Sequence, residues 1–174
     1  MSVFETERLV MRPWREDDAE NLYKYASDPE VGPSAGWPVH TSVEDSLRVL
    51  REVLIEDKTW AVTIKPSDEP VGSIGVFRTD APNGNGAPEI GYWIGKPFWG
   101  CGYIPEAVRA LIDRCFNDGA ESVWCSHFAG NDKSRRVIEK CGFRYVMTKP
   151  WQPTPEAVCD ALYYKITRKE WEHD

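Results

Sequence analysis

Gly100 and Gly102 are the residues of this chain whose spacing points most directly to chemistry. They follow the apolar segment Glu89–Ile94, which is typical of a strand. They precede a segment with apolar residues at helical spacing: Ala107, Leu111, Ile112 and Cys115. A glycine turn at a helix N-terminus leaves several backbone N–H groups unpaired, and the helix dipole adds partial positive charge there. The pattern therefore indicates a main-chain site for a phosphate or diphosphate.

The glycine pair alone leaves an ordinary tight turn open as the alternative. Two familiar phosphate loops do not fit. A P-loop requires Lys and then Ser or Thr after its last glycine, whereas Gly102 is followed by Tyr103 and Ile104. A dinucleotide-binding loop requires Gly or Ala at the helix start, where this chain has Pro105, and an acidic residue after the next strand. That strand, Ser122–Phe128, ends in His and Phe.

Composition narrows the function classes. The 174 residues suffice for one domain, which we expect to span residues 1–174. The net charge of −7 argues against nucleic acid as a partner, because a phosphate-tracking surface needs clustered Lys and Arg. No apolar run has membrane-spanning length and no signal-peptide pattern is present, so we expect no membrane partner. Five cysteines without a CxxC pair indicate reduced thiols and a cytoplasmic location. No residue cluster has metal-ligand spacing, so we expect no metal.

Hydrophobic periodicity predicts an α+β fold. We expect seven strands: Arg8–Trp14, Thr59–Lys65, Val71–Arg78, Glu89–Ile94, Ser122–Phe128, Phe143–Thr148 and Leu162–Thr167. We expect four helices, which begin near Asp17, Ser42, Pro105 and Asn131. Gly142 is a typical stop for the last of these helices. The segments Asp28–His40 and Lys149–Asp160 are predicted to be loops.

Several blocks then resemble one known family. They are EIGYWIG from residue 89, WGCGYIPEAVRALI from residue 99 and NDKSRRVIEKCGF from residue 131. In this order they resemble the GCN5-related N-acetyltransferases (GNAT). The opening ETERLVMRPWREDDAENLY and the closing ALYYKITRKEW resemble the branch typified by the ribosomal-protein alanine N-acetyltransferases (RimJ/RimL-like). The resemblance covers the whole chain. It implies a single mixed, mostly antiparallel central sheet of about seven strands flanked by about four helices, with strands 4 and 5 splayed.

The resemblance implies acetyl-CoA as the acetyl donor. In the family the diphosphate lies against main-chain amides of a Q/R-x-x-G-x-G/A loop, which maps here onto Trp99, Gly100, Cys101, Gly102, Tyr103 and Ile104. Trp99 replaces the polar first residue and Ile104 replaces the small last one. Amide donation does not depend on those side chains, so we expect the binding site to be retained. Gly102 would let a phosphate approach where a Cβ would intrude.

The same resemblance assigns the rest of the cofactor site. The pantetheine arm is expected to pair with the backbone of one strand: Ile90, Gly91, Tyr92 and Trp93. Asn131 is expected to hydrogen-bond the same arm. From the residues alone, Asn131 is equally well explained as the cap of the helix that follows it.

Catalysis requires a base for the amine and an acid for the departing thiolate. The Tyr that many family members use as the acid is replaced by Ile138, and Ser134 is the candidate acid of this branch, also in contact with the cofactor. Its alternative is a first-turn serine bonded to backbone. Glu89 is the first candidate base and His127 the second. Their alternatives are a solvated strand-end carboxylate and a satisfied polar residue. Glu106 is assigned to the helix dipole.

The acceptor is expected to be a small-molecule amine or a peptide N-terminal amine, with a ribosomal protein among the candidates. Trp37, His40 and Trp151 lie in the two segments where the family places acceptor recognition. Aromatic loops wall small pockets, but they also simply pack. A monomer and a homodimer are both compatible with the sequence. The alternative function is a non-catalytic coenzyme A-binding sensor or scaffold module, which thiol release from acetyl-CoA would distinguish from an enzyme.

Overall fold

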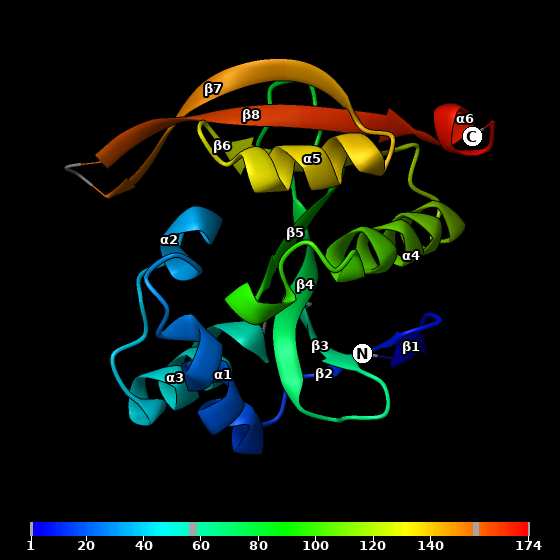
Figure 1. Cartoon of the computed structure of the whole chain (residues 1–174). Coiled ribbons are helices and arrows are strands. Elements are labelled where there is room, and N and C mark those ends of the chain that lie inside the picture. Colours follow the sequence, from blue (N-terminus) through cyan, green and yellow to red (C-terminus); the bar gives the residue numbers. More distant parts are fainter. Residues whose placement is uncertain (1, 56–58, 155–156, 174) are drawn as a thin grey trace. The chain divides into compact units, whose positions relative to one another are not determined.

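The computed structural model describes residues 2–55, 59–154 and 157–173 (Figure 1). Within these residues the chain forms eight strands and six α-helices. The strands are hydrogen-bonded in the order β1-β2-β3-β4-β5-β6-β8-β7. Every pair with a described register is antiparallel except β5 with β6, which is parallel. The predicted α+β class with a mixed, mostly antiparallel sheet is confirmed, with one strand and two helices more than expected.

The chain divides into two compact units. The first comprises Met1–Gly75 and Tyr92–Ala107, and the second comprises Val76–Gly91 and Val108–Asp174. Three elements contribute residues to both units: β4 (Pro70–Arg78), β5 (Pro88–Ile94) and α4 (Tyr103–Asn117). The expected single domain over residues 1–174 stays a prediction.

The first unit packs two helices, α1 and α3, beside each other (Figure 1). Its remaining elements are β1 (Phe4–Glu5), β2 (Leu9–Pro13), α1 (Ala19–Ala26), α2 (Gly32–Ala35), α3 (Val43–Val49) and β3 (Thr59–Ile64). Ser42 caps α3, since its Oγ accepts the Asp45 N–H at 3.0 Å. After Val49 the helix widens into a π-helical turn, Leu50–Leu54. The core combines Trp14, which follows β2, with residues of α1, the π-helical turn and β3: Ala19, Leu22, Ala26, Leu50 and Ala61.

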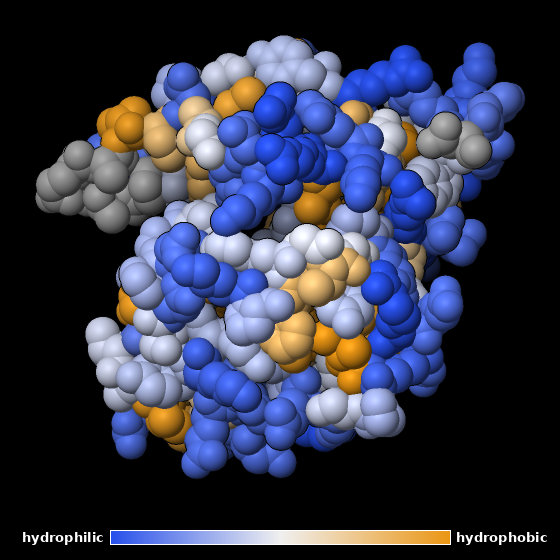
Figure 2. Space-filling view, viewed as in Figure 1, coloured by the Kyte–Doolittle hydropathy of each residue, from blue (hydrophilic) through white to orange (hydrophobic). Residues whose placement is uncertain are grey.

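The second unit has β6 (Ser122–Phe128) paired with a long hairpin of β7 (Arg144–Thr154) and β8 (Ala157–Thr167). Helix α5 (Asp132–Lys140) lies along β6, and a short α6 (Arg168–Trp171) follows β8 (Figure 1). Gly142, with φ +84°, follows α5 in the left-handed conformation expected of its stop. The outward face of α5 is hydrophilic (Figure 2).

Both predicted loops contain regular structure. Asp28–His40 holds α2, which begins with a proline in its first turn and ends at Gly36, with φ +91°. Lys149–Asp160 is largely strand, because β7 and β8 continue through it, and residues 155–156 lie outside the described residues. Pro150 indicated a loop, but β7 is the last strand of the sheet, and a proline on an edge strand loses no necessary ladder hydrogen bond.

Within residues 2–55, 59–154 and 157–173, no helix combines the length and apolar character that crossing a membrane requires.

Candidate functional site

The glycine loop follows β5 through a short 3-10 turn, Lys96–Phe98. Gly100 has φ +76° and Gly102 has φ +80°, so both adopt the left-handed backbone that residues with a Cβ avoid. A Cβ at Gly100 would have no atom within 4 Å, and a Cβ at Gly102 would lie 3.4 Å from Arg8 Nη2. Backbone conformation, rather than tight packing, therefore requires glycine at these two positions.

Helix α4 begins at this loop with amides that lack protein acceptors. The Glu106 N–H donates to the Gly102 carbonyl at 3.3 Å. Among the described residues, the N–H groups of Gly102, Tyr103 and Ile104 have no acceptor, and Pro105 has no N–H to donate. These amides lie at the positive end of the helix dipole, the arrangement that binds phosphate at helix N-termini.

A side-chain network holds this loop against the start of the chain. Glu106 accepts hydrogen bonds from Thr6 Oγ1 at 2.5 Å, from the Arg8 N–H at 2.9 Å and from Arg8 Nε at 2.7 Å. Arg8 Nη1 also donates to the Cys101 carbonyl at 3.1 Å. Burial opposes ionisation of Glu106, but these hydrogen bonds outweigh it and lower the pKa of its carboxyl. Glu106 therefore does more than complement the helix dipole.

The two departures from the family loop pattern are used in packing. The Trp99 indole N–H donates to the Ile94 carbonyl at 2.9 Å, and the Ile104 side chain is buried. Between them Cys101 is exposed. None of the side chains from position 99 to position 104 carries a charge, so the loop side chains offer an anion no countercharge.

The strand β5 carries the candidate base at its start. Glu89 is opposite Trp124 in the parallel register with β6, and its Oε1 accepts the Ser126 hydroxyl at 2.6 Å. The next residue, Ile90, is buried, and its carbonyl accepts the Cys125 thiol at 3.2 Å. Glu89 and Ile90 are the two β5 residues whose pairing with β6 is described. Splaying of the two strands stays a prediction.

The remaining β5 positions differ in their surroundings. A Cβ at Gly91 would lie 2.9 Å from the Phe77 ring, so a larger residue would displace that ring. Tyr92 is half-buried. Trp93 stacks on Trp14 with ring centroids 6.4 Å apart and meets Trp37 edge-on at 5.5 Å.

Asn131 is the cap of α5. Its Oδ1 accepts the backbone N–H of Ser134 at 3.1 Å. This geometry is the capping alternative that the sequence left open. The proposed roles of the Asn131 amide and the Ser134 hydroxyl stay predictions. Ile138, in place of the family tyrosine, is fully buried.

His127 is a buried histidine with both ring nitrogens bonded. Nδ1 lies 2.9 Å from the Phe128 carbonyl, and Nε2 lies 3.2 Å from the Tyr164 hydroxyl. Because a carbonyl only accepts, we assign the proton to Nδ1, and Nε2 accepts from Tyr164. That hydrogen bond occupies the lone pair a base would need. The geometry therefore favours Glu89 over His127 as the base.

The three predicted acceptor-binding residues belong to different units, and their shared role stays a prediction. Trp37 and His40 contact each other in the first unit, with ring centroids 5.2 Å apart. His40 is buried, its Nδ1 lies 2.8 Å from Ser46 Oγ, and burial lowers the pKa of its imidazole. Trp151 belongs to the second unit, lies in β7 rather than a loop and stacks on Phe128 at 4.5 Å.

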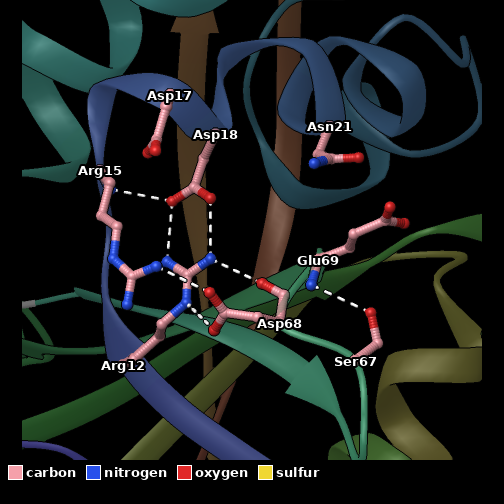
Figure 3. Close-up of a pocket in the computed structure, with 8 residues that line it drawn as sticks. All are labelled: Arg12, Arg15, Asp17, Asp18, Asn21, Ser67, Asp68 and Glu69. Carbon is pink, nitrogen blue, oxygen red and sulfur yellow. Dashed lines mark hydrogen bonds and ion pairs between the residues drawn. The ribbon is translucent and has the colours of Figure 1, made fainter.

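The structure also contains a charged hollow of about 420 Å³ in the first unit (Figure 3). Its lining comes from β2, the start of α1 and the β3–β4 turn: Arg12, Arg15, Asp17, Asp18, Asn21, Ser67, Asp68 and Glu69. Within the part of the chain that the structure describes, no group of three His, Cys, Asp or Glu side chains could hold a metal ion, there or elsewhere.

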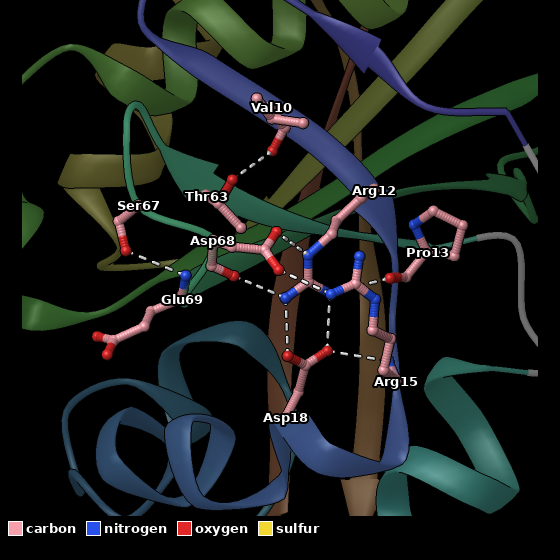
Figure 4. A network of polar contacts seen from close by, with 9 residues as sticks. All are labelled: Val10, Arg12, Pro13, Arg15, Asp18, Thr63, Ser67, Asp68 and Glu69. Carbon is pink, nitrogen blue, oxygen red and sulfur yellow. Dashed lines mark hydrogen bonds and ion pairs between the residues drawn. The ribbon is translucent and has the colours of Figure 1, made fainter.

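The Arg12 guanidinium beside this hollow has an acceptor for each of its donors (Figure 4). Nη1 and Nη2 bind the two Asp18 oxygens, both at 2.8 Å, and also the Pro13 and Asp68 carbonyls, while Nε binds the Asp68 carboxylate at 2.7 Å. Burial raises the pKa of Asp68, but hydrogen bonds from Arg12 and Arg15 outweigh it, and the pKa is lowered. Arg12 is thus structural, and we assign the hollow no ligand.

A family model described as "Acetyltransferase (GNAT) domain" matches residues 8–144 of this chain. The chain belongs to the GNAT acetyltransferase family. It is therefore an acyltransferase that uses acetyl-CoA as donor and transfers the acetyl group to an amine.

Relatives of this GNAT enzyme match most of its length. It is 35% identical to a protein of Bacillus licheniformis named "Uncharacterized N-acetyltransferase p20", over 98% of this chain and 99% of the relative. It is 27% identical to the ribosomal-protein-serine acetyltransferase of Escherichia coli, over 78% of this chain and 71% of the relative. The solved structure of a GNAT-family acetyltransferase from Bacillus anthracis superposes with a TM-score of 0.83 at 25% identity, covering 97% and 99% of the two chains.

Sequence reasoning missed two contacts of the GNAT candidate residues. Arg8 is 98 positions from Glu106, and Ser126 is 37 positions from Glu89. Neither pair has a local spacing signal, and a single sequence does not reveal which distant residues meet.

We expect Gly102→Glu to abolish acetyl-CoA binding while the protein stays folded. The new carboxylate would repel a diphosphate at the amides of α4. Isothermal titration calorimetry measures the affinity, and circular dichroism checks the fold. Gly119→Glu is the matched control, because Gly119 also has a left-handed φ, +95°, and open space at its Cβ. Unchanged affinity in Gly102→Glu would remove the loop from the donor site.

We expect Asp18→Ala to lower the free energy of unfolding by roughly 3–5 kcal/mol, because it leaves the buried Arg12 guanidinium without its main partner. Urea denaturation measures this loss. The control is Glu16→Ala, which removes an exposed ion pair with Arg51 and should change stability little. Equal losses in the two variants would contradict the structural role of Arg12.

Proposed function

We propose that this enzyme acetylates the α-amine of a peptide N-terminus, as a member of the RimJ/RimL-like branch. The observation that carries the donor part of the proposal is the set of amides at Gly102, Tyr103 and Ile104, which have no acceptor among the described residues. They offer a main-chain grip for the donor's diphosphate. The relative from Escherichia coli, named for a ribosomal-protein substrate, supports the peptide as acceptor class.

The rest of the donor is proposed to contact backbone and cap residues. The pantetheine arm pairs with the backbone of β5 from Ile90 to Trp93. Asn131 donates its side-chain amide to the same arm while its oxygen continues to cap α5. An amide side chain serves both purposes because its oxygen accepts and its nitrogen donates.

The reaction is proposed to be direct attack of the amine on the thioester. Glu89 takes the amine proton, directly or through a water. Ser126 donates to one carboxylate oxygen and so fixes the orientation of Glu89. Ser134 donates a proton to the departing CoA thiolate. An α-amine, with a reference pKa near 8, is neutral far more often than a lysine amine near 10.4, so a simple carboxylate base suffices.

The three buried cysteines are poorly suited to forming an acyl-enzyme, the alternative to a ternary complex. An acyl-enzyme would require a thiolate nucleophile. Burial raises the pKa of Cys115 and Cys141 to about 11, so both are protonated at neutral pH. Cys125 is buried, and its thiol donates to the Ile90 carbonyl.

The first test is thiol release from acetyl-CoA with a panel of acceptors. We expect turnover with peptides that begin in a free Ala or Ser, and little with the same peptides after Nα-acetylation, even where they contain lysine. Initial-velocity plots should intersect, as ternary-complex kinetics require. Tight CoA binding without turnover on any peptide or small amine would instead favour the non-catalytic module. Turnover only with small amines would show that the acceptor is a small molecule and not a peptide N-terminus.

The second test separates chemistry from capping. Ser134→Ala keeps the backbone N–H that Asn131 caps, so the fold should be unaffected while the chemical step slows about 10²–10⁴-fold. Asn131→Asp keeps a capping oxygen but loses the amide donor, so KM for acetyl-CoA should rise at unchanged stability. Single-turnover assays and thermal unfolding measure the two effects. An unchanged chemical step in Ser134→Ala would exclude Ser134 as the acid.

A further inference from the structure

Arg8 lies directly against the glycine loop, although it comes from the chain segment before β2. Its Nη1 donates to the Cys101 carbonyl at 3.1 Å, and its guanidinium carbon lies 4.6 Å from the centre of the Tyr103 ring. Its Nη2 lies 3.4 Å from the point where a Cβ of Gly102 would stand. All four residues belong to the first unit, and Arg8 is thus beside the amides that lack acceptors.

The guanidinium of Arg8 keeps donors for a ligand. Arginine has five N–H donors. One of them, at Nε, binds Glu106, and one at Nη1 binds the Cys101 carbonyl. Among the described residues, no acceptor is present for the two donors of Nη2 and the second donor of Nη1. The side chain is 43% exposed, so solvent or a ligand reaches it. Arg12 shows the opposite arrangement, with every donor occupied.

The position of Arg8 is fixed before any ligand binds. Glu106 receives both the Arg8 backbone N–H and Nε, and Thr6 holds the same carboxylate. The Tyr103 ring supports one face of the guanidinium. A preorganised side chain loses little conformational entropy on binding, which favours affinity.

The charge of Arg8 also matters for binding an anion at this loop. The lowered pKa of Glu106 keeps its carboxylate ionised at neutral pH, in the first turn of α4 where an anion is expected. That carboxylate alone would repel a phosphate. Lys96 on the same loop is already paired with Glu30. Arg8 cancels the charge of Glu106 and leaves guanidinium N–H donors available to a ligand.

We infer that Arg8 is a binding residue for the diphosphate of acetyl-CoA, in a fork of donors beside the amides of Gly102, Tyr103 and Ile104. This inference rests on the proposed donor site at the glycine loop. Guanidinium groups match phosphate oxygens with paired N–H donors, which a loop of neutral side chains does not offer. Arg8 thereby takes the place of a polar residue at position 99, from a distant part of the chain.

The test compares Arg8→Met with the wild-type chain by calorimetry, using CoA and dephospho-CoA, and by turnover with S-acetylpantetheine, which has no phosphate. Arg8→Met should weaken CoA and dephospho-CoA alike by about tenfold to a hundredfold, and leave turnover with S-acetylpantetheine unchanged. The affinity of the variant for CoA should also depend less on salt concentration, since one charge contact is lost. A merely structural arginine would not produce this salt effect.

Arg51→Met is the matched control, because Arg51 also forms an exposed ion pair with a carboxylate, Glu16, away from the loop. It should keep wild-type affinity and salt dependence. If Arg8→Met does not fold, Arg8→Lys replaces it. That variant keeps the charge but not the fork, so CoA binding should weaken severalfold with its salt dependence retained.

Other results would overturn the inference. Equal losses with CoA and S-acetylpantetheine would make Arg8 purely structural. Weaker binding of CoA alone, with dephospho-CoA unaffected, would place Arg8 at the 3′-phosphate instead of the diphosphate. Wild-type affinity in both Arg8 variants would remove Arg8 from the donor site while the proposed function stands. Failure of the wild-type chain to bind CoA would overturn the proposed function itself.

Discussion

The left-handed backbone at Gly100 and Gly102 is the constraint on which the proposed donor site depends. It turns the chain sharply enough for α4 to begin at Tyr103 with its first amides outside the intrahelical ladder. A helix start of this kind must find acceptors in solvent, in the protein or in a ligand. Here the protein offers none among the described residues, and the Arg8–Glu106 pair holds the turn in place. Folding and the proposed anion recognition therefore share one set of interactions.

In the second unit, too, the same side chains serve local structure and the proposed site. Asn131 caps α5 with its oxygen, and Ser126 orients Glu89, so the residues proposed to act on the donor and the amine are held by local structure. His127 illustrates the contrast. Both of its ring nitrogens are hydrogen-bonded within the protein, so a role as base would require it to give up one of these bonds. The hydrogen-bond partners of Glu89 and His127, more than their residue types, distinguish the two candidate bases.

How much the sequence predicts depends on the range of the interaction. The glycine loop, the start of α4 and the Gly142 stop follow from local preferences, and all are present. Pro150 predicts a loop, but the structure has a hairpin there. Proline is tolerated because β7 is an edge strand, and which strand lies at the edge depends on the whole sheet. The Arg8–Glu106 contact, likewise, depends on two segments that only the fold brings together.

The end strands of the sheet have a bearing on how copies of this chain meet. One edge strand is β1, which has two residues. The other is β7, in which Pro150 lacks a backbone N–H. Edge strands that are short or contain proline pair poorly with a strand from another molecule. Self-association by joining sheets edge to edge is thereby disfavoured.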